Sequence, residues 1–226
     1  MKSILLSIFS IALLPGSTWQ NIQSPTETQT VLYVQEGSVD RTVLEFNIDG
    51  FHLIPVDTPD GTMFLARLQD GASILEKGAP DMHKYSRSII IPDNKEMGVK
   101  VLASDYVEYN NILIAPSKGN MTRNINPSDI PYEFGNVYSK DIFYPDNVVD
   151  LADPYILRDA RGQSVVFYPI HYNPVQKILR VYKKIKIEVF SKGPGSLNIL
   201  NRNSSQSIIP KEYQNIYENH FMNYTN

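Results

Sequence analysis

The histidines, serines and acidic residues are the candidates for catalysis in this sequence, and their spacing argues against it. The four histidines, His52, His83, His171 and His220, show no HxxxH, HxH or Cys/His spacing typical of a metal site. Cysteine is absent, which excludes a thiol nucleophile, thiolate ligands and disulfides. No serine lies in a G-x-S-x-G motif, and no glycine pattern for phosphate binding leads into a helix. We therefore predict a protein that is not an enzyme and needs no metal or cofactor.

The N-terminus reads as an export signal. Lys2 precedes an apolar run at 4–14 that is too short to remain as a membrane span, and Pro15, Gly16 and Ser17 follow as a break with small residues. We predict a signal peptide at 1–19, cleaved near residues 17–19, and one domain at 20–226. No later apolar stretch approaches a spanning length, so we expect no membrane contact after cleavage.

The charge balance bears on partners and compartment. The full chain has 21 basic and 24 acidic residues, and loss of Lys2 leaves 20 − 24 = −4. Without a basic cluster, a nucleic-acid partner is not expected. A disulfide-free exported domain favours a bacterial periplasm or exterior.

The pattern of the chain predicts an all-β protein. Short segments rich in β-branched and aromatic residues recur between turn signals such as Pro59-Asp60-Gly61, which is typical of an antiparallel sandwich. Residues 179–189 alternate most clearly, and Lys183 interrupts their apolar face, which suggests a position near the rim of a sheet. The predicted fold is a jelly-roll-like antiparallel β-sandwich.

A short helix is expected at the C-terminus. Pro210 suits a first helical turn, and an apolar stripe at helical spacing follows it. The stripe consists of Tyr213, Ile216, Tyr217 and Phe221.

The stretch "SKGNMTRNINPSDIPY", residues 117–132, holds a single arginine, Arg123, among turn-forming and small polar residues. A loop arginine taken alone indicates a solvated side chain. Its type nevertheless suits one kind of recognition, because the planar guanidinium group binds a carboxylate through paired, charge-assisted hydrogen bonds.

Three stretches resemble a known family. Residues 75–93 ("LEKGAPDMHKYSRSIIIPD"), 111–182 and 217–224 ("YENHFMNY") are similar to the N-terminal prodomain of Arg-specific gingipains, which are secreted, caspase-like cysteine peptidases of Gram-negative bacteria. The resemblance implies a β-sandwich that caps the peptidase active site, keeps the enzyme latent and assists its folding. The implied partner is therefore an Arg-specific gingipain-type cysteine peptidase.

The resemblance also implies a role for the arginine loop. In the family, the loop that matches "APSKGNMTRNINP" enters the active-site cleft, and its arginine occupies the pocket for the residue before the scissile bond. Carried over, that arginine is Arg123. The inhibitory loop around it is predicted to comprise Asn120, Met121, Thr122, Arg123, Asn124 and Ile125.

Several alternatives stay open. The chain ends at Asn226 without a catalytic domain, which favours a freestanding periplasmic inhibitor over a piece excised from a precursor. A binding or adhesion module for glycan or protein, built on the same sandwich, is the rival from another class, and it predicts exposed aromatic residues gathered on one sheet face. A hydrolase would need a serine or aspartate beside a histidine in a pocket.

Overall fold

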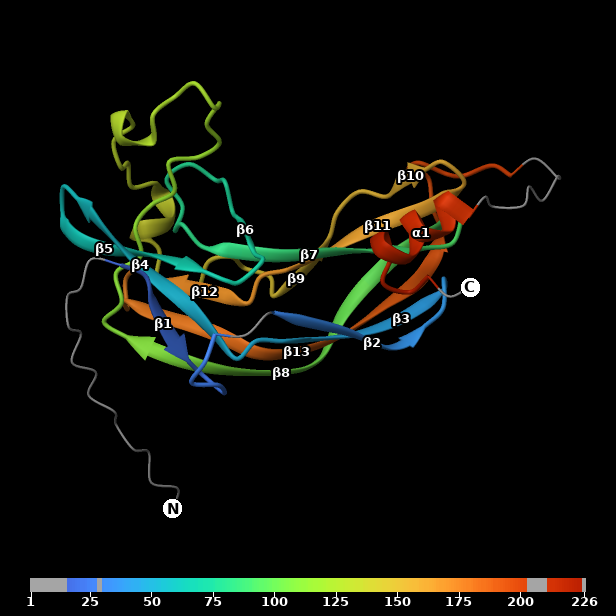
Figure 1. The fold of residues 1–226 in the computed structure, drawn as a ribbon, viewed down its shortest axis with the longest axis horizontal. Coiled ribbons are helices and arrows are strands. Elements are labelled where there is room, and N and C mark those ends of the chain that lie inside the picture. The colour runs from blue at the N-terminus through green and yellow to red at the C-terminus, as the bar shows by residue number, and fades with distance from the viewer. Residues whose placement is uncertain (1–15, 28–29, 203–210, 225–226) are drawn as a thin grey trace, which may run out of the picture.

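A computed structural model of the chain describes residues 16–27, 30–202 and 211–224. Its strands form two five-stranded sheets and one three-stranded sheet, and every strand pair is antiparallel. Figure 1 shows the two larger sheets as stacked layers, with the three-stranded sheet at one end and the helix α1 at the other. The predicted all-β, antiparallel sandwich with a short C-terminal helix is confirmed, whereas a third sheet was not predicted.

The lower sheet is organised around its longest strand, β13 (Ile178–Pro194). Strand β8 pairs with β13 along its whole length, while β12 and then β3 share its other edge, and β2 pairs with β3. The remaining strands of this sheet are β2 (Val31–Gly37), β3 (Arg41–Asn47), β8 (Lys95–Asn110) and β12 (Ile170–Asn173).

The alternation predicted for β13 is confirmed by burial. Its apolar residues on the core face are fully buried, namely Leu179, Val181, Ile185, Ile187 and Val189. Lys183 does not mark a rim, because it lies in the middle of the strand. It stands at a β-bulge, where the neighbour of β13 changes from β12, paired through Val181, to β3, paired from Lys184. The interruption in the pattern therefore marks a change of strand neighbour.

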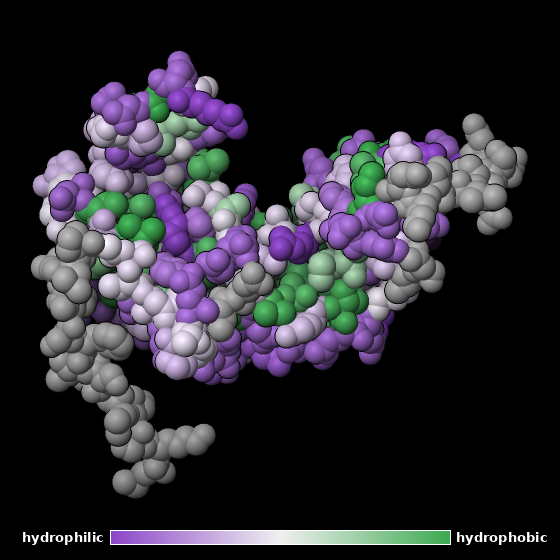
Figure 2. All heavy atoms as spheres, viewed as in Figure 1, coloured by the Kyte–Doolittle hydropathy of each residue, from purple (hydrophilic) through white to green (hydrophobic). Residues whose placement is uncertain are grey.

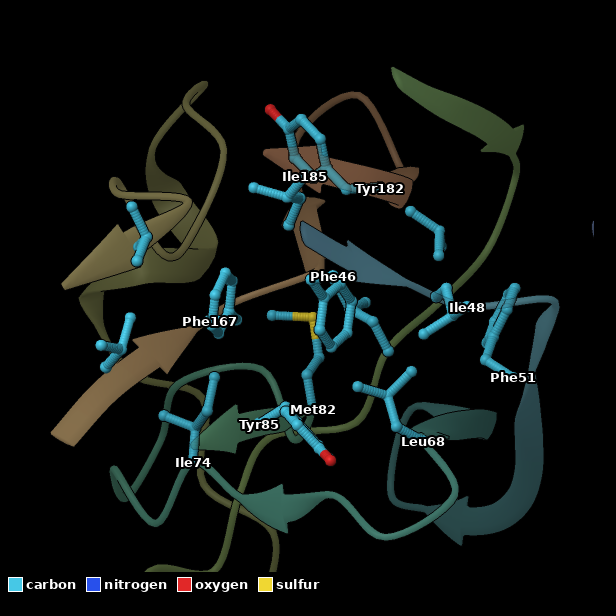
Figure 3. Packing of buried hydrophobic residues seen from close by; sticks show 14 of the residues in the cluster. Phe46, Ile48, Phe51, Leu68, Ile74, Met82, Tyr85, Phe167, Tyr182 and Ile185 are labelled. Carbon is cyan, nitrogen blue, oxygen red and sulfur yellow. The ribbon is translucent and has the colours of Figure 1, made fainter. Parts of the chain in front are cut away.

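The upper sheet closes the core. Its strands are β6 (Ala72–Ser73), β7 (His83–Ile90), β9 (Val149–Leu151), β10 (Tyr155–Leu157) and β11 (Ala160–Phe167). Phe46 of β3 stacks on Phe167 of β11 at 5.2 Å between ring centroids and tilts against Tyr85 of β7 at 5.5 Å. Figure 3 shows these rings among the apolar side chains of both layers. This aromatic contact between sheets is the centre of the core.

The third sheet consists of β1 (Thr18–Asn21), β4 (Gly50–Thr58) and β5 (Gly61–Arg67). The predicted turn at Pro59-Asp60-Gly61 joins β4 to β5, and Gly61 takes a φ of 104°, a conformation that glycine accepts without steric cost. Strand β1 crosses the boundary predicted at residue 19, and the Trp19 ring packs against the His52 ring and over Gly50. The apolar run at 4–14 lies outside the described residues.

Helix α1 (Lys211–His220) forms at the predicted place, although only half of its apolar stripe is buried. Tyr217 and Phe221 are 1% and 2% exposed, whereas Tyr213 and Ile216 are 39% and 46% exposed. The segment after the helix fixes this end, because the Asn223 amide bonds both the N–H (2.7 Å) and the C=O (2.9 Å) of Ile90 in β7. Pro210 lies outside the described residues.

His171 of β12 makes the stability of the fold sensitive to acid. Its ring is 3% exposed, lies 5.1 Å from the ring of Tyr182, and donates from Nε2 to the carbonyl oxygen of Tyr168 at 2.9 Å. Burial lowers the pKa of His171 to about 4 and outweighs the hydrogen bond to the Tyr168 carbonyl, which raises it. Arg180 adds a smaller lowering effect, and Asp146 opposes it. The folded state therefore binds fewer protons than the unfolded state at pH values between about 4 and the ordinary value of 6.5.

We expect the free energy of unfolding to be highest above pH 6.5 and to fall, by on the order of 3 kcal/mol from this group, as the pH decreases toward 4. Urea denaturation at neutral and acidic pH measures this loss. A His171→Gln variant keeps a neutral donor and should show a shallower pH dependence. An unchanged pH dependence in that variant would contradict the assignment.

Within the described ranges, no helix has the length and apolar character needed to cross a membrane.

Candidate functional site: the projecting arginine loop

The predicted inhibitory loop belongs to a long excursion between two strands. The chain leaves β8 at Asn110 and next enters a strand at Val149 of β9. Between them it forms only two short 3-10 helices, η1 (Pro127–Asp129) and η2 (Asn136–Ser139). Figure 1 shows this yellow-green segment standing away from the sandwich at the end opposite α1. In Figure 2 the segment overhangs a hollow in the visible face, on the side toward α1.

The first half of the excursion is fixed to the body by backbone hydrogen bonds. Phe64 of β5 donates to Leu113 and accepts from Ala115 at 2.8 and 2.9 Å, and Ser117 donates to Ala79 at 2.7 Å. Ala115 is fully buried and Ser117 is 3% exposed. The loop therefore begins from a buried, hydrogen-bonded segment of the body.

Glycines let the loop approach the segment before β7 closely. Gly119 has a φ of 81°, and a Cβ placed there would lie 3.0 Å from the Cβ of Lys77. Gly135 on the return path donates its N–H to Gly78 at 2.9 Å. A side chain at position 119 would be strained both by its backbone conformation and by this contact.

The returning half is anchored by two tyrosines. Tyr138 donates its hydroxyl to the carbonyl of Ile114 at 2.8 Å, and Tyr144 donates its hydroxyl to Glu76 at 2.9 Å. Tyr144 also exchanges two backbone hydrogen bonds with Tyr172 of β12, at 2.9 and 2.8 Å. Burial raises the pKa of both the Tyr138 and the Tyr144 hydroxyls, which therefore remain hydrogen-bond donors. Both ends of the excursion are thus attached to the sandwich.

Arg123 lies at the corner of a tight turn within the projecting segment. The N–H of Ile125 donates to the carbonyl of Thr122 at 3.0 Å, which makes Arg123 and Asn124 the two central residues of a β-turn. The Thr122 hydroxyl donates to the Asn124 side-chain oxygen at 2.6 Å. Arg123 is exposed, and within residues 16–27, 30–202 and 211–224 its guanidinium group has no hydrogen-bond, ion-pair or aromatic partner.

The other predicted loop residues surround this turn. Asn120, Thr122, Asn124 and Ile125 are exposed, and Met121 is half-buried. The structure thus presents all six predicted residues on one projecting segment. Whether they contact a peptidase stays a prediction.

Two supporting residues were missed by the sequence reasoning. Lys118 donates from Nζ to the carbonyl of Pro127 at 2.7 Å and lies 4.2 Å from the centre of the Tyr132 ring. Asn126 caps η1 by accepting from the Ser128 backbone N–H at 3.2 Å and from its hydroxyl at 2.7 Å. The pattern Asn-Pro-Ser-Asp, with an asparagine cap before an N1 proline, is the signal that could have predicted η1. No sequence signal predicts the Lys118 contact, because it joins residues nine positions apart.

Neither a metal-ligand cluster nor the aromatic face expected of a glycan-binding module is assembled in the described part of the chain. No group of three or more acidic residues or histidines there could hold a metal ion. The strongly exposed aromatic residues there are scattered: Tyr33 lies on β2, Tyr106 on β8, Phe134 in the irregular segment before η2, and Tyr213 on α1.

The face of the lower sheet opposite the core is already occupied by intramolecular contacts. Glu188 there is paired with both Arg41 and Lys100. Farther along, the Arg180 guanidinium lies 4.5 Å from the Tyr106 ring centre and 3.8 Å from that of Phe143. A glycan would have to displace these contacts in order to stack on the rings.

Comparison with known proteins identifies the family. Residues 20–221 match the family Propeptide_C25. The chain is 40% identical over 183 residues to gingipain R1 of Porphyromonas gingivalis, which covers 81% of this chain and 18% of that protein. It is 37% identical over 181 residues to gingipain R2 of the same species, covering 80% of this chain and 24% of that protein. The chain thus spans less than a quarter of the length of these relatives.

Two solved structures share the fold. A chain of the complex of Porphyromonas gingivalis RgpB pro- and mature domains superposes with a TM-score of 0.78 at 34% identity, covering 86% of this chain and 98% of that one. A structure on the zymogenic latency of gingipain K superposes with a TM-score of 0.66 at 20% identity, covering 79% and 100%, and supports the fold alone. The matched family comprises propeptides and not catalytic domains, so the chain is not itself an enzyme. This protein belongs to the gingipain propeptide family, Propeptide_C25.

Proposed function

We propose that this protein inhibits an Arg-specific gingipain-type cysteine peptidase by inserting the loop around Arg123 into its active site. The observation that carries the proposal is the state of Arg123, which is exposed in a turn of an anchored loop and free of partners among the described residues. The similar chain in the RgpB structure comes from a complex of pro- and mature domains, which supports a catalytic domain as the partner.

The physical basis is preorganisation. A pocket selective for arginine needs an acidic, partly desolvated site, because the guanidinium fork then forms two charge-assisted hydrogen bonds with a carboxylate. The turn at Thr122–Ile125 and the anchors at Ser117 and Tyr138 order the loop before it binds. Little conformational entropy is then lost on docking, and the affinity increases accordingly.

The domain boundaries and the compartment follow from the same assignment. We propose that the domain spans residues 20–226 after removal of a signal peptide at 1–19, and that it acts on the peptidase in the periplasm or after secretion. A cut at residue 17 keeps β1 whole, whereas a cut at 19 removes the contact of Trp19 with Gly50.

We also propose that the sandwich assists folding of the catalytic domain, because binding the native enzyme more tightly than the unfolded chain stabilises it.

Inhibition assays test the proposal. Purified protein without residues 1–17 is titrated against a mature Arg-specific gingipain and, in parallel, against a Lys-specific gingipain. We expect inhibition of the Arg-specific enzyme at submicromolar protein and inhibition weaker by about tenfold or more for the Lys-specific enzyme, whose pocket accommodates an ammonium group. Unaffected hydrolysis by the Arg-specific enzyme at micromolar protein would refute the inhibitor function.

A further inference from the structure

We propose that the loop is built to resist cleavage after Arg123, because its own hydrogen bonds hold the Arg123–Asn124 peptide inside a turn. The inference rests on the proposed function for the identity of the peptidase, although the resistance itself is a property of the loop. It assigns positioning roles to Thr122 and Lys118.

The problem arises from the proposed mode of binding. An inhibitor that offers arginine to an Arg-specific enzyme also offers it a bond to cut. In cleavage, the peptidase thiol adds to the Arg123 carbonyl, the C–N bond breaks, and the amine of Asn124 leaves with the proton. Water then hydrolyses the thioester, which frees the Arg123 carboxylate and restores the thiol. The first step requires the carbonyl to lie in line with the thiolate, with the chain on both sides of the bond fitted into the cleft.

The turn opposes that alignment. The Arg123–Asn124 peptide is its central peptide, closed by the 3.0 Å bond from Ile125 to Thr122. The 2.6 Å bond from the Thr122 hydroxyl to the Asn124 side chain crosses the same peptide. Both bonds must open before the chain can extend across the bond to be cut.

A further hydrogen bond, outside the turn, joins the two sides of the loop. Lys118 precedes the turn and Pro127 follows it, and the 2.7 Å bond between them joins the two arms. The position of the Lys118 ammonium is fixed in addition by the Tyr132 ring at 4.2 Å. Past the turn, η1 fixes the next residues, since the backbone N–H of Asp129 donates to the carbonyl of Asn126 at 3.0 Å. The chain that would have to occupy the cleft beyond the scissile bond is therefore already folded back.

Trypsin tests the resistance without any need for gingipain recognition. The full mature chain, Thr122→Val and Thr122→Ser are digested, and the fragment that begins at Asn124 is followed by mass spectrometry. We expect Thr122→Val to be cut after Arg123 about tenfold faster than wild type, Thr122→Ser to behave as wild type because it keeps the hydroxyl, and all three to melt at the same temperature. Synthetic peptides of residues 118–128 with either side chain should be cut at equal rates.

Two results would overturn the inference. One is an equal rate of cutting for Thr122→Val and wild type in the folded chain. The other is cutting of the folded wild type as fast as its peptide.

A second experiment uses an Arg-specific gingipain in place of trypsin. We expect wild-type inhibition to stay constant over hours, and inhibition by Lys118→Met to decay as the Arg123–Asn124 bond is cut. If wild type never inhibits, the proposed function fails. The trypsin experiment then still decides whether the loop resists cleavage, because it does not depend on gingipain. If wild type inhibits at first but is cut as fast as Lys118→Met, the proposed function survives and the present inference is wrong.

Discussion

Replacing Arg123 with alanine is expected to weaken inhibition of an Arg-specific gingipain by about a hundredfold or more, measured as the inhibition constant. The guanidinium group would move from solvent into an acidic, desolvated pocket, and truncating such a buried charged anchor costs on the order of 2–4 kcal/mol of binding free energy. Arg123→Lys keeps the charge but loses the planar fork, so it should inhibit at an intermediate strength.

The matched control for this variant is Arg158→Ala. Arg158 is also exposed and lies in the turn between β10 and β11, at the end of the molecule opposite the loop (Figure 1). Its removal should change the inhibition constant less than about twofold, since side chains outside an interface contribute little to binding. If Arg123→Ala inhibited as strongly as wild type, the family assignment would stand, but the role of Arg123 would be lost.

Replacing Arg161, unlike replacing Arg123, should cause a large loss of stability. Arg161 of β11 is 1% exposed, and its guanidinium group donates to four backbone carbonyls at 2.6–2.8 Å. The acceptors belong to two separate segments and are those of Pro92, Lys95, Leu197 and Asn198. Arg161→Met would leave these carbonyls without a donor, at a cost of about 3–5 kcal/mol in the free energy of unfolding.

Urea denaturation measures this cost, and Arg161→Lys should lose less because an ammonium can still serve up to three acceptors. Arg123→Ala is the stability control. Since Arg123 has no partner among the described residues, its variant should unfold within about 0.5 kcal/mol of wild type. An Arg161→Met protein as stable as wild type would contradict the role given to the buried guanidinium.

The two arginines show what sequence can and cannot predict here. Both occur beside turn residues, and sequence alone indicates a solvated side chain for each. Arg161 is instead buried, because strands distant in sequence bring carbonyls around it. The importance of Arg123 was inferred from resemblance, and only the structure shows that it is exposed in a turn of an anchored loop.

Local pattern predicted the elements that are stabilised by their own periodicity. The alternation of β13 and the Pro59-Asp60-Gly61 turn are confirmed because burial on one face and turn chemistry are local properties. The short strands β6, β9 and β10, of two or three residues, carry no periodicity and form only through pairing with longer neighbours. Half of the stripe on α1 stays exposed because only Tyr217 and Phe221 meet the sandwich side of the helix.

The loop depends both on local sequence and on contacts with distant residues. Its turn-forming composition predicted irregular structure, and residues 122–125 form a β-turn. Its anchoring depends on contacts with distant residues, such as Gly78 with Gly135 and Tyr144 with Tyr172, which no local pattern reports. Sequence therefore predicted where the loop is, whereas the structure shows how it is held.

The central claim is that Arg123 occupies the arginine pocket of the peptidase, and binding to an enzyme whose pocket is already filled tests it most directly. The mature gingipain is reacted with a small covalent inhibitor that ends in arginine, and the affinities of wild type and Arg123→Ala for free and blocked enzyme are measured by calorimetry. We expect wild type to bind the blocked enzyme about a hundredfold more weakly than the free enzyme, and Arg123→Ala to distinguish the two far less. Equal affinity of wild type for free and blocked enzyme would contradict the account.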